Sequence, residues 1–318
     1  MEPTTLRRTQ ETAFISPTRI VVATDLTDGD YLVPHVIAQA KASNARVTLI
    51  HAILPTDTFP LEAGYVSYLD ETVMEREVRV ALTDIAGKIE REGIFCDVSF
   101  KHGFAADVVR GTIKTTGATR LIMGSHGRGK LGQLALGSVA NQLLGSVDIP
   151  VFVVGPHVLA AANHVVPRRI LHPVSLAGDY RKSADLALVL AQSYGAELTF
   201  LHVLDRDVEQ TVNRERTLTW AKNALMALVP KSDGLALPVH ARATYGKLVE
   251  EILGAAIQTG ADWIVLGVNK EVSSLPFRDS NAYKVIVAAK CGVLTIHHNP
   301  QGVEEENSRE MHLASAIG

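Results

Sequence analysis

Residues 124–138 read GSHGRGKLGQLALGS, a glycine-rich segment between a short apolar run and a helix pattern. The run LIM at residues 121–123 predicts a buried strand. The pattern that follows, with apolar residues at Val139, Leu143 and Val147, predicts a helix. The five glycines leave room for main-chain N–H groups to approach an anion, and the positive end of the helix dipole lies behind them. The segment therefore predicts a phosphate-binding loop.

Two common nucleotide motifs overlap in this segment, and the neighbouring residues argue against both. The P-loop pattern GxxxxGK is present, but it is followed by Leu131, whose side chain cannot replace the metal-binding Ser or Thr of a P-loop. The dinucleotide pattern GxGxxG is present over residues 127–132, but the helix pattern starts later than that motif requires. The acid about twenty residues on, Asp148, precedes the next apolar run instead of ending it.

Composition limits the classes of protein to consider. The 318 residues are 47% hydrophobic and 20% charged, which suits two cores of ordinary size. The net charge of −3 provides no broad basic surface for nucleic acid. Two cysteines far apart in sequence predict neither a disulfide framework nor a zinc site. Without a membrane-length apolar run, or an apolar signal core in residues 1–17, we expect a cytoplasmic protein that does not enter a membrane.

Strand-like and helix-like patterns alternate through the first half of the chain. The apolar, β-branched runs lie at residues 19–25, 47–52, 98–100, 121–124 and 150–154, with amphipathic helix patterns between them. Alternation at this spacing predicts an α/β fold, with an open, parallel, doubly wound sheet and helices on both faces.

The second half of the chain repeats the first. From Gly103 onward the two copies align at a constant spacing of 143 residues, which pairs Gly103 with Gly246 and Gly124 with Gly267. A tandem duplication explains this agreement, because glycine positions carry main-chain demands that other residues meet poorly. We predict one domain at residues 18–156 and a second at residues 168–298.

The fifth strand of each copy is apolar, at Val151 to Val154 and at Leu294 to Ile296. The exposed edge of an open sheet must be paired or covered. We therefore expect these two strands to pair and to form an intramolecular pseudo-dimer.

The second copy keeps the scaffold but loses the glycine-rich loop. Lys270 stands where the first copy has Gly127, and Ser280 and Asn281 replace Gly137 and Ser138. Asp25, at the end of the first strand, corresponds to Ser175. We expect one intact phosphate site and one degenerate site, unless Lys270 itself binds an anion.

A third pattern, GxxG followed after nine residues by GS, fits Gly124, Gly127, Gly137 and Ser138 without adjustment. It resembles the nucleotide signature of the universal stress protein family, and the resemblance covers about residues 19–297 in two tandem copies. It implies a Rossmann-like fold in each copy and ATP as ligand, with Mg²⁺ entering together with the nucleotide.

The same resemblance assigns roles to single residues. Asp25 would recognise the nucleoside, and the main-chain groups of Ala52 would meet adenine. Gly124, Gly127, Gly137 and Ser138 would hold the phosphates, and Val139 would add an N–H group at the start of the helix. The sequence departs from some members at Ala140, where they carry a hydroxyl residue.

Several residues have a simpler alternative. Asp25 could cap the helix that follows the first strand. His126 and Arg128 lie in the loop, where they would contact phosphate or remain ordinary solvated side chains. His51 and His202 occupy equivalent strand ends in both copies, which favours a structural role for both.

Rapid phosphoryl transfer needs a positioned base and firmly held metal ions, and the sequence assigns no residue to either task. The resemblance implies a regulator of stress adaptation that binds an adenine nucleotide and an unknown protein partner. We expect no enzyme activity beyond slow ATP hydrolysis. An ATP-dependent enzyme of a related adenine-binding α/β family and a nucleotide-free interaction protein stay open as alternatives, as does a homodimer of chains.

Overall fold

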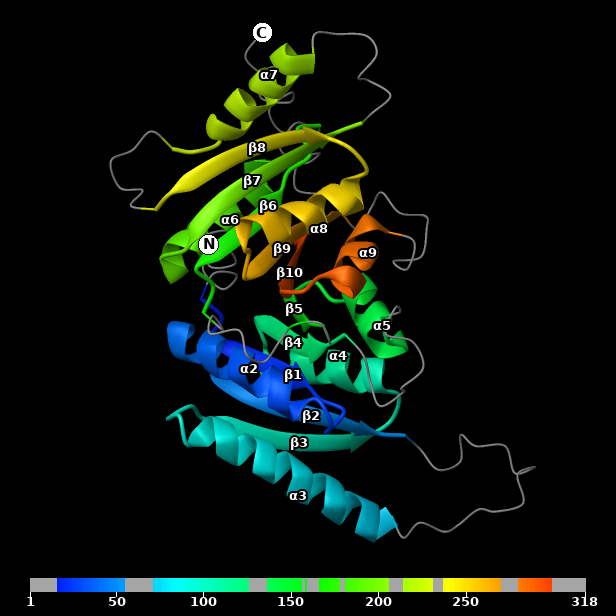
Figure 1. The fold of residues 1–318 in the computed structure, drawn as a ribbon. Helices are drawn as coiled ribbons and strands as arrows, with labels where there is room; N and C mark the ends of the chain where they lie inside the picture. Colours follow the sequence, from blue (N-terminus) through cyan, green and yellow to red (C-terminus); the bar gives the residue numbers. More distant parts are fainter. Residues whose placement is uncertain are drawn as a thin grey trace, which may run out of the picture.

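The computed structural model describes residues 16–54, 71–125, 136–155, 158, 166–177, 181–205, 214–230, 237–269 and 280–298. Across these residues ten strands form one sheet in the order β3-β2-β1-β4-β5-β10-β9-β6-β7-β8, drawn along the length of the molecule in Figure 1. Strands alternate with helices throughout, which confirms the predicted α/β class.

The two halves contain the same succession of elements. The first half has β1 (Arg19–Ala23), α2 (Gly29–Ser43), β2 (Arg46–Ile53), α3 (Glu71–Glu90), β3 (Cys96–His102), α4 (Ala105–Thr116), β4 (Arg120–Gly124), α5 (Ser138–Ser146) and β5 (Val151–Val154). The second half has β6 (Arg169–Pro173), α6 (Arg181–Tyr194), β7 (Glu197–Leu204), α7 (Arg214–Met226), β8 (Val239–Tyr245), α8 (Leu248–Thr259), β9 (Trp263–Asn269), α9 (Asn281–Ala288) and β10 (Gly292–His298). Strand pairs within each half are parallel, as predicted.

The halves join through their fifth strands. β5 and β10 pair antiparallel, with Phe152 opposite Leu294. The predicted strand pairing is therefore confirmed, and it fuses the two five-stranded sheets into one. Gly292, at the start of β10, lies against the ring of Phe152, where an added Cβ would stand 2.3 Å from Cζ. The join uses up two apolar edges that would otherwise be exposed.

Helices cover both faces of this sheet (Figure 1). Buried residues of α2, α3, α6 and α7 pack in one hydrophobic cluster, and those of α4, α5, α8 and α9 pack in another. Neighbours in a strand point to opposite faces, so Val22 joins the first cluster and Val21 the second. Among the described residues, no helix has both the length and the apolar character that a membrane crossing needs.

A polar contact and a cluster of tilted and edge-on aromatic rings span the join on the face of α2 and α6. Arg120 is fully buried; it donates to Gln39 Oε1 at 2.9 Å and hydrogen-bonds the side chain of Tyr194. Trp263 stands 143 residues after Arg120 and is equally buried. Its ring centroid lies 4.7 Å from that of Phe152 and 5.1 Å from that of Tyr194. Tyr194 thus contacts both Arg120 and Trp263, which occupy equivalent positions in the two halves.

Candidate functional site

The candidate site lies at the carboxyl ends of the first five strands. From β1 the chain builds β2 and β3 on one side and then returns to place β4 and β5 on the other. Ligands of open α/β sheets bind at such a reversal point, outside the carboxyl ends of the strands. Asp25 follows β1, Ala52 lies near the end of β2, and Gly124 ends β4.

Three more predicted residues follow at the start of α5. Gly137 occupies its N-cap position, and Ser138 and Val139 are its first helical residues. His126, Gly127 and Arg128 lie outside the described residues, so their predicted roles stay predictions.

Asp25 is fixed by a short turn after β1. Its Oδ1 accepts hydrogen bonds from the N–H of Thr27 at 2.8 Å and from the Thr27 hydroxyl at 2.7 Å. The residue between them, Leu26, has φ of 72°, a conformation that costs energy for a residue with a side chain and that tends to occur at functional sites. The N-cap position of α2 belongs to Asp28, so the alternative that Asp25 caps this helix is wrong.

Asp28 is a neighbouring carboxylate that the sequence prediction did not include in the site. It is only 3% exposed and accepts a hydrogen bond from the Thr24 hydroxyl. Burial raises the pKa of Asp28 to about 6, and the nearby charge of Asp25 adds to the rise. The depth of its burial depends on packing that the sequence does not reveal.

The main-chain groups of Ala52 face the end of β1. The N–H of Thr24 donates to the carbonyl of Ile50 at 3.1 Å, and the β1–β2 pairing ends with Ala23 opposite Ile50. Alternate residues of a parallel strand direct their main-chain groups to the same side. The N–H and C=O groups of Ala52 therefore lie just past the last paired residue of β1, an arrangement suited to the edge of a planar ring.

The two equivalent histidines make the same contact. The Nδ1 atom of His51 lies 2.8 Å from the carbonyl oxygen of Thr24, and that of His202 lies 2.8 Å from the carbonyl oxygen of Val174. A carbonyl only accepts, so each Nδ1 carries the proton and donates. The predicted structural role of both histidines is confirmed, because each ties the end of one strand to the next.

Two hydrogen bonds close the base of the glycine-rich loop. The N–H of Ser125 donates to the carbonyl of Val154 at 2.9 Å, and the N–H of Gly137 donates to the carbonyl of Ser125 at 2.8 Å. The chain therefore leaves and re-enters the described structure at one point, directly beside the start of α5.

The start of α5 suits an anion. Its N-cap residue, Gly137, has φ of −57° and ψ of 149° and provides no side-chain cap. The first turn contains no acidic residue. The first N–H groups of a helix have no partner within the helix, so they and the helix dipole can bind a phosphate oxygen.

The start of α9 in the second half is closed. Ser280, the equivalent of Gly137, has nearly the same main-chain angles, with φ of −72° and ψ of 153°. Its hydroxyl accepts the N–H of Tyr283 at 3.1 Å. By sequence equivalence, this helix end corresponds to the phosphate site of the first half. Here the side chain of Ser280 caps it. Lys270 lies outside the described residues.

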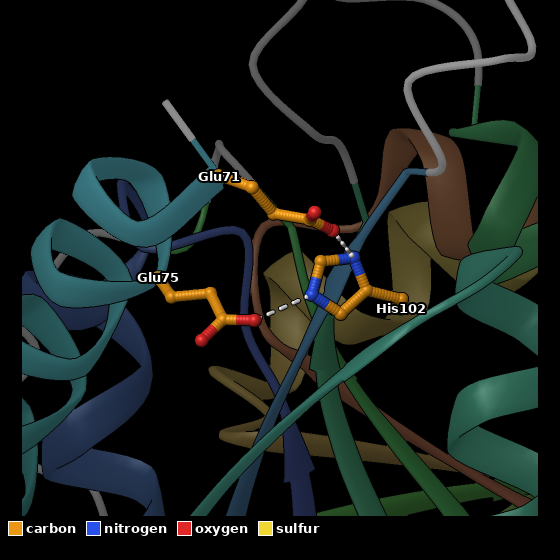
Figure 2. Close-up of side chains that lie close together, drawn as sticks. All are labelled: Glu71, Glu75 and His102. Carbon is orange, nitrogen blue, oxygen red and sulfur yellow. Dashed lines mark hydrogen bonds and ion pairs between the residues drawn. The ribbon is translucent and has the colours of Figure 1, made fainter. Parts of the chain in front are cut away.

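Glu71, Glu75 and His102 form a polar cluster at the end of β3, on the same carboxyl-end edge of the sheet as the candidate site. Figure 2 shows the imidazole of His102 between two carboxylates from successive turns of α3. Its Nδ1 lies 3.3 Å from Glu71 Oε1 and its Nε2 lies 2.9 Å from Glu75 Oε1. Each of the three residues has one atom that could bind a metal ion, and these three atoms lie within 4.8 Å of one another. Because the carboxylates face opposite ring nitrogens, we interpret the cluster as a polar link between α3 and β3.

Two hollows in the second half lie at the opposite edge, by the amino ends of the strands. One is lined mainly by apolar residues of α8 and by residues 288–291 before β10. The other is lined by Arg169, Glu197, Thr199, His240, Arg242 and Thr259. Neither contains a residue predicted for nucleotide binding.

Both halves of the chain match one protein family. The model of the universal stress protein family matches residues 17–155 and again residues 167–297. No curated protein is similar enough in sequence to match.

Solved structures share the fold over nearly the whole chain. A universal stress protein from Archaeoglobus fulgidus DSM 4304 is 20% identical, with a TM-score of 0.68 over 91% of this chain and 98% of its own. A functionally unknown protein from Pseudomonas aeruginosa PAO1 is 16% identical, with a TM-score of 0.64 over 94% and 99%. A putative universal stress protein from Pseudomonas aeruginosa UCBPP-PA14 is 16% identical, with a TM-score of 0.62 over 90% and 95%.

Proposed function

This chain belongs to the universal stress protein family as a tandem of two domains, and from that premise we propose that its first domain alone binds an adenine nucleotide, ATP above all. Occupancy would regulate the binding of a protein partner during stress adaptation. The observation that carries the proposal is the contrast between two equivalent helix ends. The start of α5 is left open by Gly137, whereas the start of α9 is capped by Ser280.

Three features support an adenine nucleotide at the open site. The signature GxxG, nine residues and GS is complete in the first domain, and its last two residues begin α5. The main-chain groups of Ala52, past the end of β1, suit the edge of adenine. The carboxylate of Asp25, fixed by Thr27, suits the hydroxyl groups of ribose, because ionised carboxylates accept hydrogen bonds.

The donors at the start of α5 fit a triphosphate with its metal. The open N–H groups favour negative charge, and no acid in the first turn of α5 opposes it. Mg²⁺ would enter with the nucleotide and neutralise part of the phosphate charge. Regulation then requires that the nucleotide bind one arrangement of the loop more tightly than another.

The direct test is ATP binding, measured by titration calorimetry, to the wild type and to Gly127→Lys. This change copies Lys270 of the second domain, and we expect it to weaken binding about tenfold or more, because lost hydrogen bonds to a charged group cost about 1.5–3 kcal/mol. Gly87→Lys is the matched control, since no atom lies within 4 Å of the position that its Cβ would take. Equal affinities for the wild type and Gly127→Lys would refute the site.

Phosphate release separates the proposed regulator from an ATP-dependent enzyme. We propose at most slow hydrolysis, because no base or metal-binding side chain is assigned. Turnover above about 1 per second would instead favour the enzyme. A wild type that binds no ATP would favour the nucleotide-free interaction protein.

A further inference from the structure

A tyrosine of the second domain reaches the nucleotide loop of the first. Tyr283 lies in the first turn of α9 and is only 9% exposed. Its hydroxyl accepts a hydrogen bond from the main-chain N–H of Leu136 at 3.1 Å, across 147 residues of sequence. Figure 1 shows α9 beside α5 at the join between the domains.

Leu136 is the residue that brings the loop back to α5. It is buried, with 7% of its surface exposed, and it precedes Gly137, which is tied to Ser125 at 2.8 Å. Two consecutive N–H groups at the base of the loop are therefore held, one by the first domain and one by the second. A buried N–H that loses its partner is costly, so the hydroxyl of Tyr283 restricts where the loop can end.

The first domain has no tyrosine at the equivalent position of α5. The residue equivalent to Tyr283 in the first domain, 143 positions earlier, is Ala140. Ala140 is buried in the same hydrophobic cluster as Leu136 and Tyr283, and it has no hydroxyl to offer the second domain. The second domain, whose helix α9 is capped, thus holds the loop of the first domain, whose helix α5 is open. Ala140 gives no matching contact in return.

We propose that Tyr283 is a positioning residue through which the second domain sets the phosphate affinity of the first. The inference rests on the proposed function, since it assigns a second-domain residue to the same nucleotide site. The ring fills space between α9 and the base of the loop, and the hydroxyl fixes the N–H of Leu136. The donors at the start of α5 are then held in place before the nucleotide arrives, which lowers the cost of ordering them.

The test is Tyr283→Phe, which keeps the ring and removes the hydroxyl. We expect the amide proton of Leu136 to exchange faster in the nucleotide-free protein, and the Kd for ATP to rise about three- to tenfold, as expected for one hydrogen bond. The Kd for adenosine should not change, because adenosine has no phosphate to meet the loop. Loss of packing alone would not separate the two ligands in this way.

Tyr245→Phe is the matched control, because Tyr245 is also a buried tyrosine of the second domain, at the end of β8. It should leave both affinities and the exchange of Leu136 unchanged. Unchanged Leu136 exchange in Tyr283→Phe would overturn the proposal, and so would an unchanged Kd for ATP. Failure of the wild type to bind ATP would overturn the proposed function and this inference together. A wild type that binds ATP, together with a Tyr283→Phe variant whose Kd and Leu136 exchange are unchanged, would overturn this inference alone.

Discussion

The starts of α5 and α9 have the same main-chain shape and opposite chemistry. Gly137 and Ser280 differ by 15° in φ and 4° in ψ, from −57° and 149° in one to −72° and 153° in the other. Glycine at this position is therefore not required by the main-chain angles. What differs is the side chain. The hydroxyl of Ser280 accepts an N–H of α9, whereas Gly137 has no side chain and leaves the equivalent N–H of α5 open. A single side chain therefore determines whether this helix end is capped or open.

The largest effect is expected at the other pair of equivalent residues, Arg120 and Trp263. Trp263→Ala should lower the free energy of unfolding by about 3–5 kcal/mol, because it empties space beside Phe152 and Tyr194. Arg120→Ala should cost about 2–6 kcal/mol, because it leaves the neutral polar groups of Gln39 and Tyr194 without this buried partner, at about 1–3 kcal/mol each. Chemical denaturation measures both. Two separate unfolding transitions in the wild type would contradict a core that the domains share.

The next largest effect on stability is expected at Asp28. It distinguishes the two domains, because no acid in the described part of the second domain is buried as deeply. Its pKa is raised from 3.8 to about 6 on folding, so its contribution to stability is present below about pH 4 and is lost as the pH rises through 6. Asp28→Asn should raise stability by about 2–3 kcal/mol at pH 7.5 relative to the wild type, and by little at pH 4.

The difference between Asp28→Asn and the wild type must be followed by denaturation at several pH values. His35, whose pKa burial lowers to about 4, gives a slope of opposite sign in both proteins, and the subtraction removes it. A difference that does not vary between pH 4 and 7.5 would show that Asp28 ionises normally.

The smallest effect converts one helix end into the other. In Gly137→Ser the new hydroxyl should accept the N–H of Ala140, as Ser280 accepts that of Tyr283. We expect ATP affinity to fall about tenfold while stability changes by only a few tenths of a kcal/mol, in the direction of a better cap. Titration calorimetry measures the affinity for ATP, and thermal unfolding measures the stability.

The reverse change, Ser280→Gly, is the control for Gly137→Ser. It opens the end of α9 but leaves Lys270 in place, so the stoichiometry of ATP binding should remain one per chain. Two ATP molecules per chain in this variant would mean that the capping serine alone closes the second site.

Sequence patterns predicted the fold well because the fold depends on local periodicity and on repetition. The α/β class, the duplication and the pairing of Val151–Val154 with the last strand all follow from apolar runs, glycine spacing and the need to cover a sheet edge. The structural role of His51 was predicted because His202 repeats it in a domain that lacks the loop.

The site was only partly predictable. Asp25, Ala52 and Gly137 lie at strand and helix ends that the pattern locates, although the N-cap position of α2 is held by Asp28 and not by Asp25. The contact of Tyr283 with Leu136 could not be predicted, because it joins residues 147 positions apart through one hydroxyl. No periodicity encodes such a contact.

The antiparallel join of β5 and β10 has a consequence for symmetry. In an assembly of identical subunits, a twofold axis copies every substitution to both sides, so a tyrosine on one side is always matched by a tyrosine on the other. Here the axis relates unlike halves of one polypeptide, so equivalent positions can carry Ala140 in one half and Tyr283 in the other. Covalent linkage also fixes the effective concentration of the two halves, so their division of labour does not depend on how much protein is present.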